Sequence, residues 1–124
     1  MVGDIIMNKK TIVFDFDGVI HSYISGWKGY DVIPDEPVEG IKEVIDELRK
    51  DYHIVVVSSR CKTNEGMSAI IQYLRKHNII VDEVMKEKPP ALIYIDDRAI
   101  CFDGNSKNLL NQINNFKTWQ EKLK

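Results

Sequence analysis

Residues 11–20 constrain the fold of this chain more than any other stretch. Their first part is apolar and rich in β-branched residues, which predicts a fully buried β-strand. Two aspartates one residue apart, Asp15 and Asp17, end the strand, and Gly18 follows directly. Because a charge buried without a partner is costly, the two carboxylates predict a compensating cation, and all-oxygen ligands of this kind suit magnesium. The alternative is a strand end capped by two solvated aspartates.

Strand and helix signals alternate along the rest of the chain. This alternation indicates an α/β fold with a mainly parallel sheet. We expect it to be a three-layer, Rossmann-like arrangement of sheet and helices. Further strands are predicted from apolar runs at residues 54–57, within 79–85, at 92–95, and as a short edge strand at 99–102.

Helical spacing of apolar residues predicts three helices. The first begins near Pro37, where a missing N–H does no harm, and includes Val44 on its apolar face. The second is capped by Thr63 or Asn64. The third, within residues 109–123, is expected to pack on the sheet.

Size and composition limit the class of protein. A chain of 124 residues is long enough for one domain with a proper core, so we take residues 1–124 as a single domain. The net charge of −2 gives no basic surface for long nucleic acid, although a short nucleic-acid end remains open. No apolar run approaches the length of a membrane span. Two cysteines are too few for a disulfide framework, which favours a reducing cytoplasm.

Polar residues follow three of the predicted buried strands. In open parallel sheets, ligands bind at the carboxyl ends of strands. These ends would therefore place carboxylates, a hydroxyl and arginines together, and Lys88 lies a few residues before the last strand. The residues are Asp15 and Asp17 after the first strand, Ser58, Ser59 and Arg60 after the second, and Asp96, Asp97 and Arg98 after the fourth.

This ordered set resembles the four motifs of the haloacid-dehalogenase-like (HAD) phosphohydrolase superfamily. The Ser-Ser-Arg and Asp-Asp-Arg sequences are similar to those of the phosphatase domain of polynucleotide kinase-phosphatases, and small bacterial and phage proteins look similar. The resemblance implies an Mg²⁺-dependent phosphomonoester hydrolase. The segments that carry it are residues 15–19, 55–58, Lys88 and 95–97.

The same resemblance implies a covalent mechanism. Asp15 would be the nucleophile that forms an aspartyl-phosphate, and its carboxylate would also bind magnesium. Asp17 would protonate the leaving alcohol and then activate water, while its backbone carbonyl would be a metal ligand.

The remaining motif residues would bind phosphate and metal. Ser58 would donate a hydrogen bond to a phosphoryl oxygen, and Lys88 would neutralise charge, with Lys86 as the competing lysine. Asp97 would be the direct metal ligand of the acidic pair. Asp96 would support it or orient Lys88.

Residues 21–36 form a long polar and aromatic connection that could be a substrate flap. We expect Trp27 or Tyr30 to stack on the substrate, with Arg60 and Gly18 also in the substrate-binding set; packing of the aromatics against the domain edge is the alternative. Arg60 could instead be a solvated or salt-bridged arginine. The intervals between motifs leave no room for a cap domain, so the partner would be a phosphorylated small molecule or an exposed phosphate end.

Other reactive side chains are predicted to be incidental. Cys61 lacks the arginine six residues later that a cysteine phosphatase needs, because Met67 stands there. Cys101 is expected in the core. His21 is expected on a surface loop, and the alternative is contact with a substrate, because His21 closely follows the first motif. Ser59 is read as the start of a loop.

Two other functions compete with the phosphohydrolase. A phosphoacceptor receiver domain has similar residue types, but it carries its acidic pair after the first strand and its acceptor aspartate after the third. This chain has Asp-x-Asp after the first predicted strand and Asp-Asp after the fourth, an order that favours the phosphohydrolase. A non-catalytic interaction domain on the same fold is the other alternative, and the intact set of motif residues counts against it.

Overall fold

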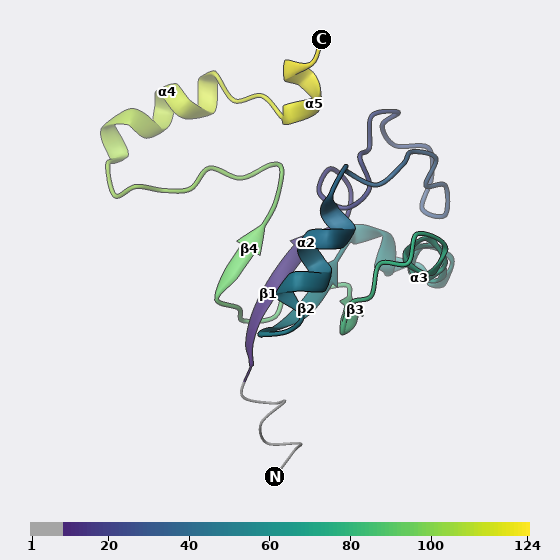
Figure 1. Ribbon diagram of the computed structural model, residues 1–124. Coiled ribbons are helices and arrows are strands. Elements are labelled where there is room, and N and C mark those ends of the chain that lie inside the picture. Colours follow the sequence, from purple (N-terminus) through teal and green to yellow (C-terminus); the bar gives the residue numbers. More distant parts are fainter. Residues whose placement is uncertain (1–8) are drawn as a thin grey trace.

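The computed structural model describes residues 9–124 and contains a parallel four-stranded sheet (Figure 1). Residues 1–8 of the predicted domain lie outside the described part. The strands pair in the order β3-β2-β1-β4. This confirms the predicted Rossmann-like α/β fold. The strands are β1 (Lys10–Asp15), β2 (Tyr52–Val57), β3 (Glu83–Met85) and β4 (Ile93–Ile95).

Two helices connect the first three strands. Helix α2 (Ile41–Leu48) follows β1, and α3 (Asn64–Lys76) follows β2. Since crossovers between parallel strands are right-handed and β1, β2 and β3 succeed one another in the sheet, both helices lie on one face. The main core forms there; its buried members include Ile12, Phe14, Ile45, Ile54, Val56 and Ile70.

The opposite face of the sheet carries a smaller cluster. Val13, Val55 and Val57 are buried on it, with Met85 and Ala91 packed against them. The connection from β3 to β4 contains no helix in the described residues. Within residues 9–124, a helix was expected to form the third layer on this face, but the short segment that connects β3 to β4 takes its place.

The helix starts follow the expected local chemistry with two differences. The Thr63 hydroxyl accepts a hydrogen bond of 2.9 Å from the Gly66 amide, so Thr63 is the cap of α3. Helix α2 begins later than expected, at Ile41, after Gly40 in a left-handed conformation (φ 82°). Val44 is half-exposed and does not belong to the apolar face.

The C-terminal third differs most from the predictions. Strand β4 was expected to be buried, but Ile93 and Tyr94 are exposed because β4 is an edge strand with one neighbour. The predicted strand at residues 99–102 is wrong, since that segment leads away from the sheet without pairing (Figure 1). Cys101 is exposed, so its predicted place in the core is also wrong.

The predicted C-terminal helix is replaced by two short ones. Helix α4 (Leu109–Asn114) follows a 3₁₀ turn (Ser106–Asn108) and ends at Asn115, a poor helix former. Its apolar side chains Leu110 and Ile113 are exposed, so α4 does not pack on the sheet as expected. Helix α5 (Trp119–Lys122) returns towards the end of β1. Across residues 9–124, none of the helices combines the length and apolar character that crossing a bilayer demands.

Candidate functional site

The three predicted motif strands end at one edge of the sheet. Asp15 pairs in register with Val57 of β2, and Phe14 pairs with Ile95 of β4. Asp15 therefore lies between Ser58, which follows β2, and the Asp96–Asp97 pair, which follows β4. The chain leaves β1 towards β2 on one side and returns to β4 on the other, which is the position where open α/β sheets bind ligands.

Three carboxylates form a cluster at this edge. Asp15, Asp96 and Asp97 each offer an oxygen, and these atoms lie within 4.8 Å of one another. Burial, followed by the charges of Asp96 and Asp97, raises the pKa of Asp15 to about 8. Burial also raises the pKa of Asp97. The Oδ1 atom of Asp97 is buried and has no hydrogen-bond partner in the structure. Concentrated negative charge and an orphaned acceptor are what a divalent cation would compensate, so the donor set fits the predicted metal.

Gly18 is required by the packing of this cluster. Its backbone has φ 87°, and a Cβ on it would lie 2.0 Å from Oδ2 of Asp97. Only glycine allows the loop after β1 to approach the carboxylate so closely. Gly18 was expected to bind substrate, but the structure shows it in contact with a predicted metal ligand and outside the lining of the catalytic pocket described below.

The Asp17 carboxylate is not part of the three-carboxylate cluster and is held by Arg60 and His21. Arg60 Nε donates to both of its carboxylate oxygens, at 2.9 and 3.2 Å. His21 Nδ1 lies 2.8 Å from Asp17 Oδ1, while His21 Nε2 accepts a hydrogen bond from the Asp35 amide at 3.1 Å. The acceptor role of Nε2 places the imidazole proton on Nδ1, which donates to Asp17. The Asp17 side chain therefore does not belong to the three-carboxylate cluster. That Asp17 binds the metal through its backbone carbonyl stays a prediction.

His21 is fully buried, so the prediction of a surface histidine is wrong. Its ring stacks on Phe16 and meets Tyr73 edge-on. Its position four residues after Asp17 is the sequence signal that could have revealed the contact. Aromatic packing with hydrogen bonds at both nitrogens makes His21 part of the site's support.

Arg60 is also fully buried, which changes its expected role. Its guanidinium is directed at Asp17 and at the loop of residues 21–36, and Arg60 does not line the pocket in this structure. Its backbone is held as well, because the Arg60 amide donates to Ser58 Oγ at 3.1 Å. The alternative of a salt-bridged arginine describes this structure.

A pocket of about 210 Å³ opens beside the cluster; we call it the catalytic pocket after the function proposed for it below. Asp15 and Asp17 line it, as does the predicted phosphate ligand Ser58. Because Ser58 Oγ accepts from the Arg60 amide, its own proton remains able to donate to a ligand. The complete lining is Asp15, Asp17, Tyr23, Trp27, Ser58, Ser59, Asp97 and Arg98.

Two of these lining residues, Ser59 and Tyr23, were read as incidental or missed in the sequence. Ser59 directly follows a motif residue, which is a weak signal. Tyr23 has a left-handed backbone (φ 61°), which is uncommon for a bulky residue, and nothing in its sequence context predicts it. Burial, followed by the charge of Asp17, raises the pKa of Tyr23, so its hydroxyl remains a proton donor at neutral pH.

The loop of residues 21–36 lies over the pocket as the flap hypothesis requires. Trp27 is 46% exposed and lines the catalytic pocket, and Tyr30 meets it edge-on with the ring centres 5.0 Å apart. Trp27 therefore packs on its own loop and also faces the pocket. Whether it contacts a substrate remains a prediction.

Lys88 is the lysine that contacts the cluster. Its Nζ lies 3.5 Å from Asp96 Oδ2 and 5.8 Å from the ring centre of Tyr94. It is half-exposed and does not line the catalytic pocket. The contact agrees with the expected orientation of Lys88 by Asp96, whereas Lys86 forms no ion pair or side-chain hydrogen bond with another described residue.

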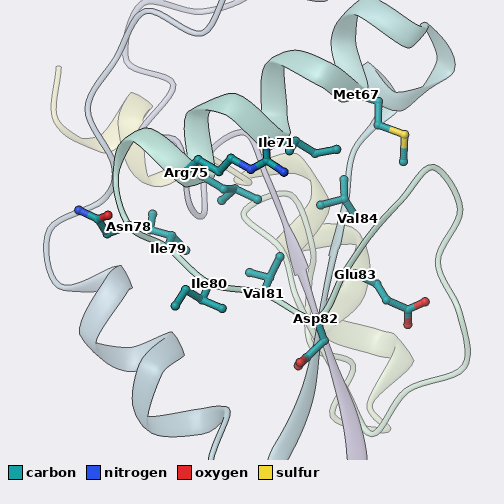
Figure 2. Close-up of a pocket in the computed structure, with 11 residues that line it drawn as sticks. Met67, Ile71, Arg75, Asn78, Ile79, Ile80, Val81, Asp82, Glu83 and Val84 are labelled. Atoms are coloured by element: carbon teal, nitrogen blue, oxygen red, sulfur yellow. The ribbon is translucent and has the colours of Figure 1, made fainter.

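A larger groove of about 530 Å³ lies at the other edge of the sheet (Figure 2). Met67 and Ile71 of α3 form one side, and Val81 and Val84 lie opposite them. It adjoins the outer strand β3, two strands away from Asp15, and contains none of the motif residues. The groove is therefore separate from the candidate active site.

Comparison with known proteins gives the fold and no activity. No family model matches the chain, and no curated protein matches it. The chain is similar in structure to the conserved protein coded by a locus from Bacteroides thetaiotaomicron, at 21% identity over 94% of this chain and 99% of that chain, with a TM-score of 0.59. At this identity the likeness supports the architecture alone.

Proposed function

We propose that this protein is a magnesium-dependent phosphomonoester hydrolase of the HAD-like superfamily. The observation that carries the proposal is the cluster of Asp15, Asp96 and Asp97, with its orphaned buried oxygen, beside a pocket that also contains Ser58 and Asp17. A cation at the cluster and a phosphoryl group in the pocket would be adjacent. The proposal includes the phosphorylated small molecule or exposed phosphate end as substrate.

In the first step, a carboxylate oxygen of Asp15 attacks phosphorus. A P–O bond to Asp15 forms, the P–O bond to the alcohol breaks, and the alcohol takes a proton from the carboxylic acid form of Asp17, which the second step regenerates. Ser58 donates to a phosphoryl oxygen, and Lys88 offsets negative charge from beside Asp96. Bound magnesium, held by Asp15, Asp97 and the carbonyl of Asp17, would neutralise charge on nucleophile and phosphoryl group together.

In the second step, water attacks the aspartyl-phosphate. Asp17 accepts a proton from that water, inorganic phosphate leaves, and the carboxylate of Asp15 is restored. The raised pKa of Asp15 makes a cation necessary for this role at neutral pH, because without one the nucleophile keeps its proton. The proposal also places the protein in the cytoplasm, which the two free cysteines, Cys61 and Cys101, support.

The decisive experiment is a screen of phosphomonoesters with magnesium. We expect turnover that EDTA abolishes and magnesium restores. Asp15→Asn should remove all activity, whereas Asp51→Asn, an exposed aspartate at the opposite end of β2, should retain it. Wild-type rates in Asp15→Asn, or full activity in EDTA, would refute the mechanism. A stable phosphoprotein without turnover would instead favour the receiver alternative.

A further inference from the structure

Arg60 joins two parts of the molecule that are distant in sequence. Its Nε donates to Asp17, 43 residues earlier. Its Nη1 lies within hydrogen-bond distance of the carbonyl oxygens of Gly29 (2.7 Å), Tyr30 (3.0 Å) and Val32 (3.2 Å). One buried side chain therefore holds both the predicted general acid and the middle of the loop above it.

The guanidinium of Arg60 also contacts the ring of Trp27. Nη2 is buried without a hydrogen-bond partner, and the guanidinium carbon lies 4.7 Å from the ring centre of Trp27. A cation over an indole face is attracted by the ring quadrupole. Trp27, which lines the catalytic pocket and is 46% exposed, is thus in contact with the group that binds Asp17.

The loop depends on such contacts because it contains no helix or extended strand. Near its ends, the carboxylate of Asp35 accepts hydrogen bonds from the amide and hydroxyl of Ser25, at 2.8 and 2.5 Å. Between these anchors the side chains of Trp27, Tyr30 and Val32 are exposed. Among the described residues, the hydrogen bonds from Arg60 to these carbonyl oxygens are what connects the middle of the loop to the protein interior.

We propose that Arg60 is a positioning residue that couples the loop of residues 21–36 to the carboxylate of Asp17. The proposal rests on the proposed phosphohydrolase function and adds a specificity device to it. A substrate with a planar or apolar body would contact Trp27, and that contact would fix Asp17, through Arg60, where it meets the leaving oxygen. Substrates with a poor leaving group and a body that reaches Trp27 are therefore the class that the site favours.

The geometry of the guanidinium is what makes this coupling possible. Arginine presents five N–H donors in a planar fork, so it can bind a carboxylate along one edge and carbonyls along another. Lysine keeps the charge but has a single donor nitrogen and no planar fork, so Arg60→Lys should weaken both links, to Asp17 and to the loop carbonyls. Arg49→Lys is a matched control, because Arg49 forms a pair with Asp82 outside the catalytic pocket.

The first test measures kcat and KM of both variants on an alkyl phosphate and an aryl phosphate. Because general acid catalysis is typically worth about 10²–10⁴-fold, Arg60→Lys should lower kcat for the alkyl ester at least tenfold. The loss should be smaller for the aryl ester, whose leaving group needs little protonation, and KM should change little. Added to Asp17→Asn, Arg60→Lys should have almost no further effect. Equal losses on both esters, or additive losses in the double variant, would overturn the proposal.

The second test needs no activity. Lys28 is exposed in the loop and offers a trypsin site. Arg60→Lys should accelerate cleavage after Lys28 severalfold, while Arg49→Lys should not, and unchanged cleavage would refute the link.

If Arg60→Lys does not fold, Trp27→Ala takes its place. Its loss of kcat should be larger for a bulky alkyl ester than for a small one. If the wild type hydrolyses no phosphomonoester, the proposed function fails, while the cleavage test still reads the link between Arg60 and the loop.

Discussion

The indole nitrogen of Trp119 donates a hydrogen bond of 2.7 Å to the carbonyl oxygen of Gly18, 101 residues earlier in the chain. The next residue, Gln120, donates to the Ser22 carbonyl at 3.1 Å. Helix α5 thus fastens the C-terminal segment to the loop that follows β1. Because Gly18 packs against Asp97, helix α5 supports this predicted metal ligand through its hydrogen bond to Gly18.

Trp119→Phe tests this support. The substitution keeps most of the packing and removes the donor to Gly18, so we expect a loss of about 1 kcal/mol in the free energy of unfolding. The apparent affinity for magnesium should fall severalfold. Denaturant unfolding and calorimetric titration measure the two effects. Trp27→Phe is the matched control; an identical drop in magnesium affinity there would contradict the special role of Trp119.

Gly18→Ala should damage the cluster more severely. A Cβ would overlap Oδ2 of Asp97, and alanine disfavours the φ of 87°. We expect a destabilisation of about 1–3 kcal/mol and loss of measurable magnesium binding. Gly26→Ala supplies the comparison, because Gly26 also has positive φ (75°) but nothing within 4 Å of an added Cβ. Equal magnesium affinity in both variants would show that the contact with Asp97 is unimportant.

The raised pKa of Asp15 predicts a pH-dependent stability. In the absence of metal, the folded protein keeps a proton on Asp15 up to about pH 8, whereas the unfolded chain releases it near the ordinary value of 3.8. The folded state therefore binds more protons between these values, and this contribution to stability falls as pH rises from about 4 to 8. Urea unfolding at several pH values in EDTA measures the slope, which Asp15→Asn should reduce.

Magnesium should reverse that trend. The cation competes with the proton on Asp15, so its apparent affinity should increase with pH up to about 8 and its binding should release protons. Calorimetry in buffers of different ionisation enthalpy counts the protons released. An affinity that is constant from pH 6 to 8 would contradict the assignment of Asp15 as a ligand.

Tyr23→Phe removes the one hydroxyl that the flap adds to the pocket lining. If that hydroxyl donates to the charged phosphoryl group, its loss should reduce kcat/KM about 10- to 100-fold, because hydrogen bonds to charged groups contribute about 1.5–3 kcal/mol. The melting temperature should change little, since the ring remains. Tyr94→Phe is a control, as Tyr94 donates to the Pro89 carbonyl outside the catalytic pocket. Unaltered kinetics in Tyr23→Phe would exclude the hydroxyl from the reaction.

Local sequence was sufficient for the central strands and the acidic edge. The runs that became β1 and β2 are continuously apolar, which a strand buried on both faces requires. Once both are parallel, the residues that follow them must meet at one edge, so the proximity of Asp15 and Ser58 could be predicted. The same reasoning failed for residues 99–102 and for α4, where short apolar runs have no partner in the described structure to bury them.

What the sequence by itself determined is therefore the set of elements whose neighbours are fixed by the sheet: the parallel α/β order and the carboxylates at its edge. Only the tertiary structure decided the direction of Arg60, the burial of His21 and the contact of Trp119 with Gly18. The physical reason is that a strand's environment repeats along its length, whereas a long polar side chain has several possible partners. Its choice depends on which acceptors the folded loops bring within about 3 Å, and those loops have no periodic pattern to reveal them.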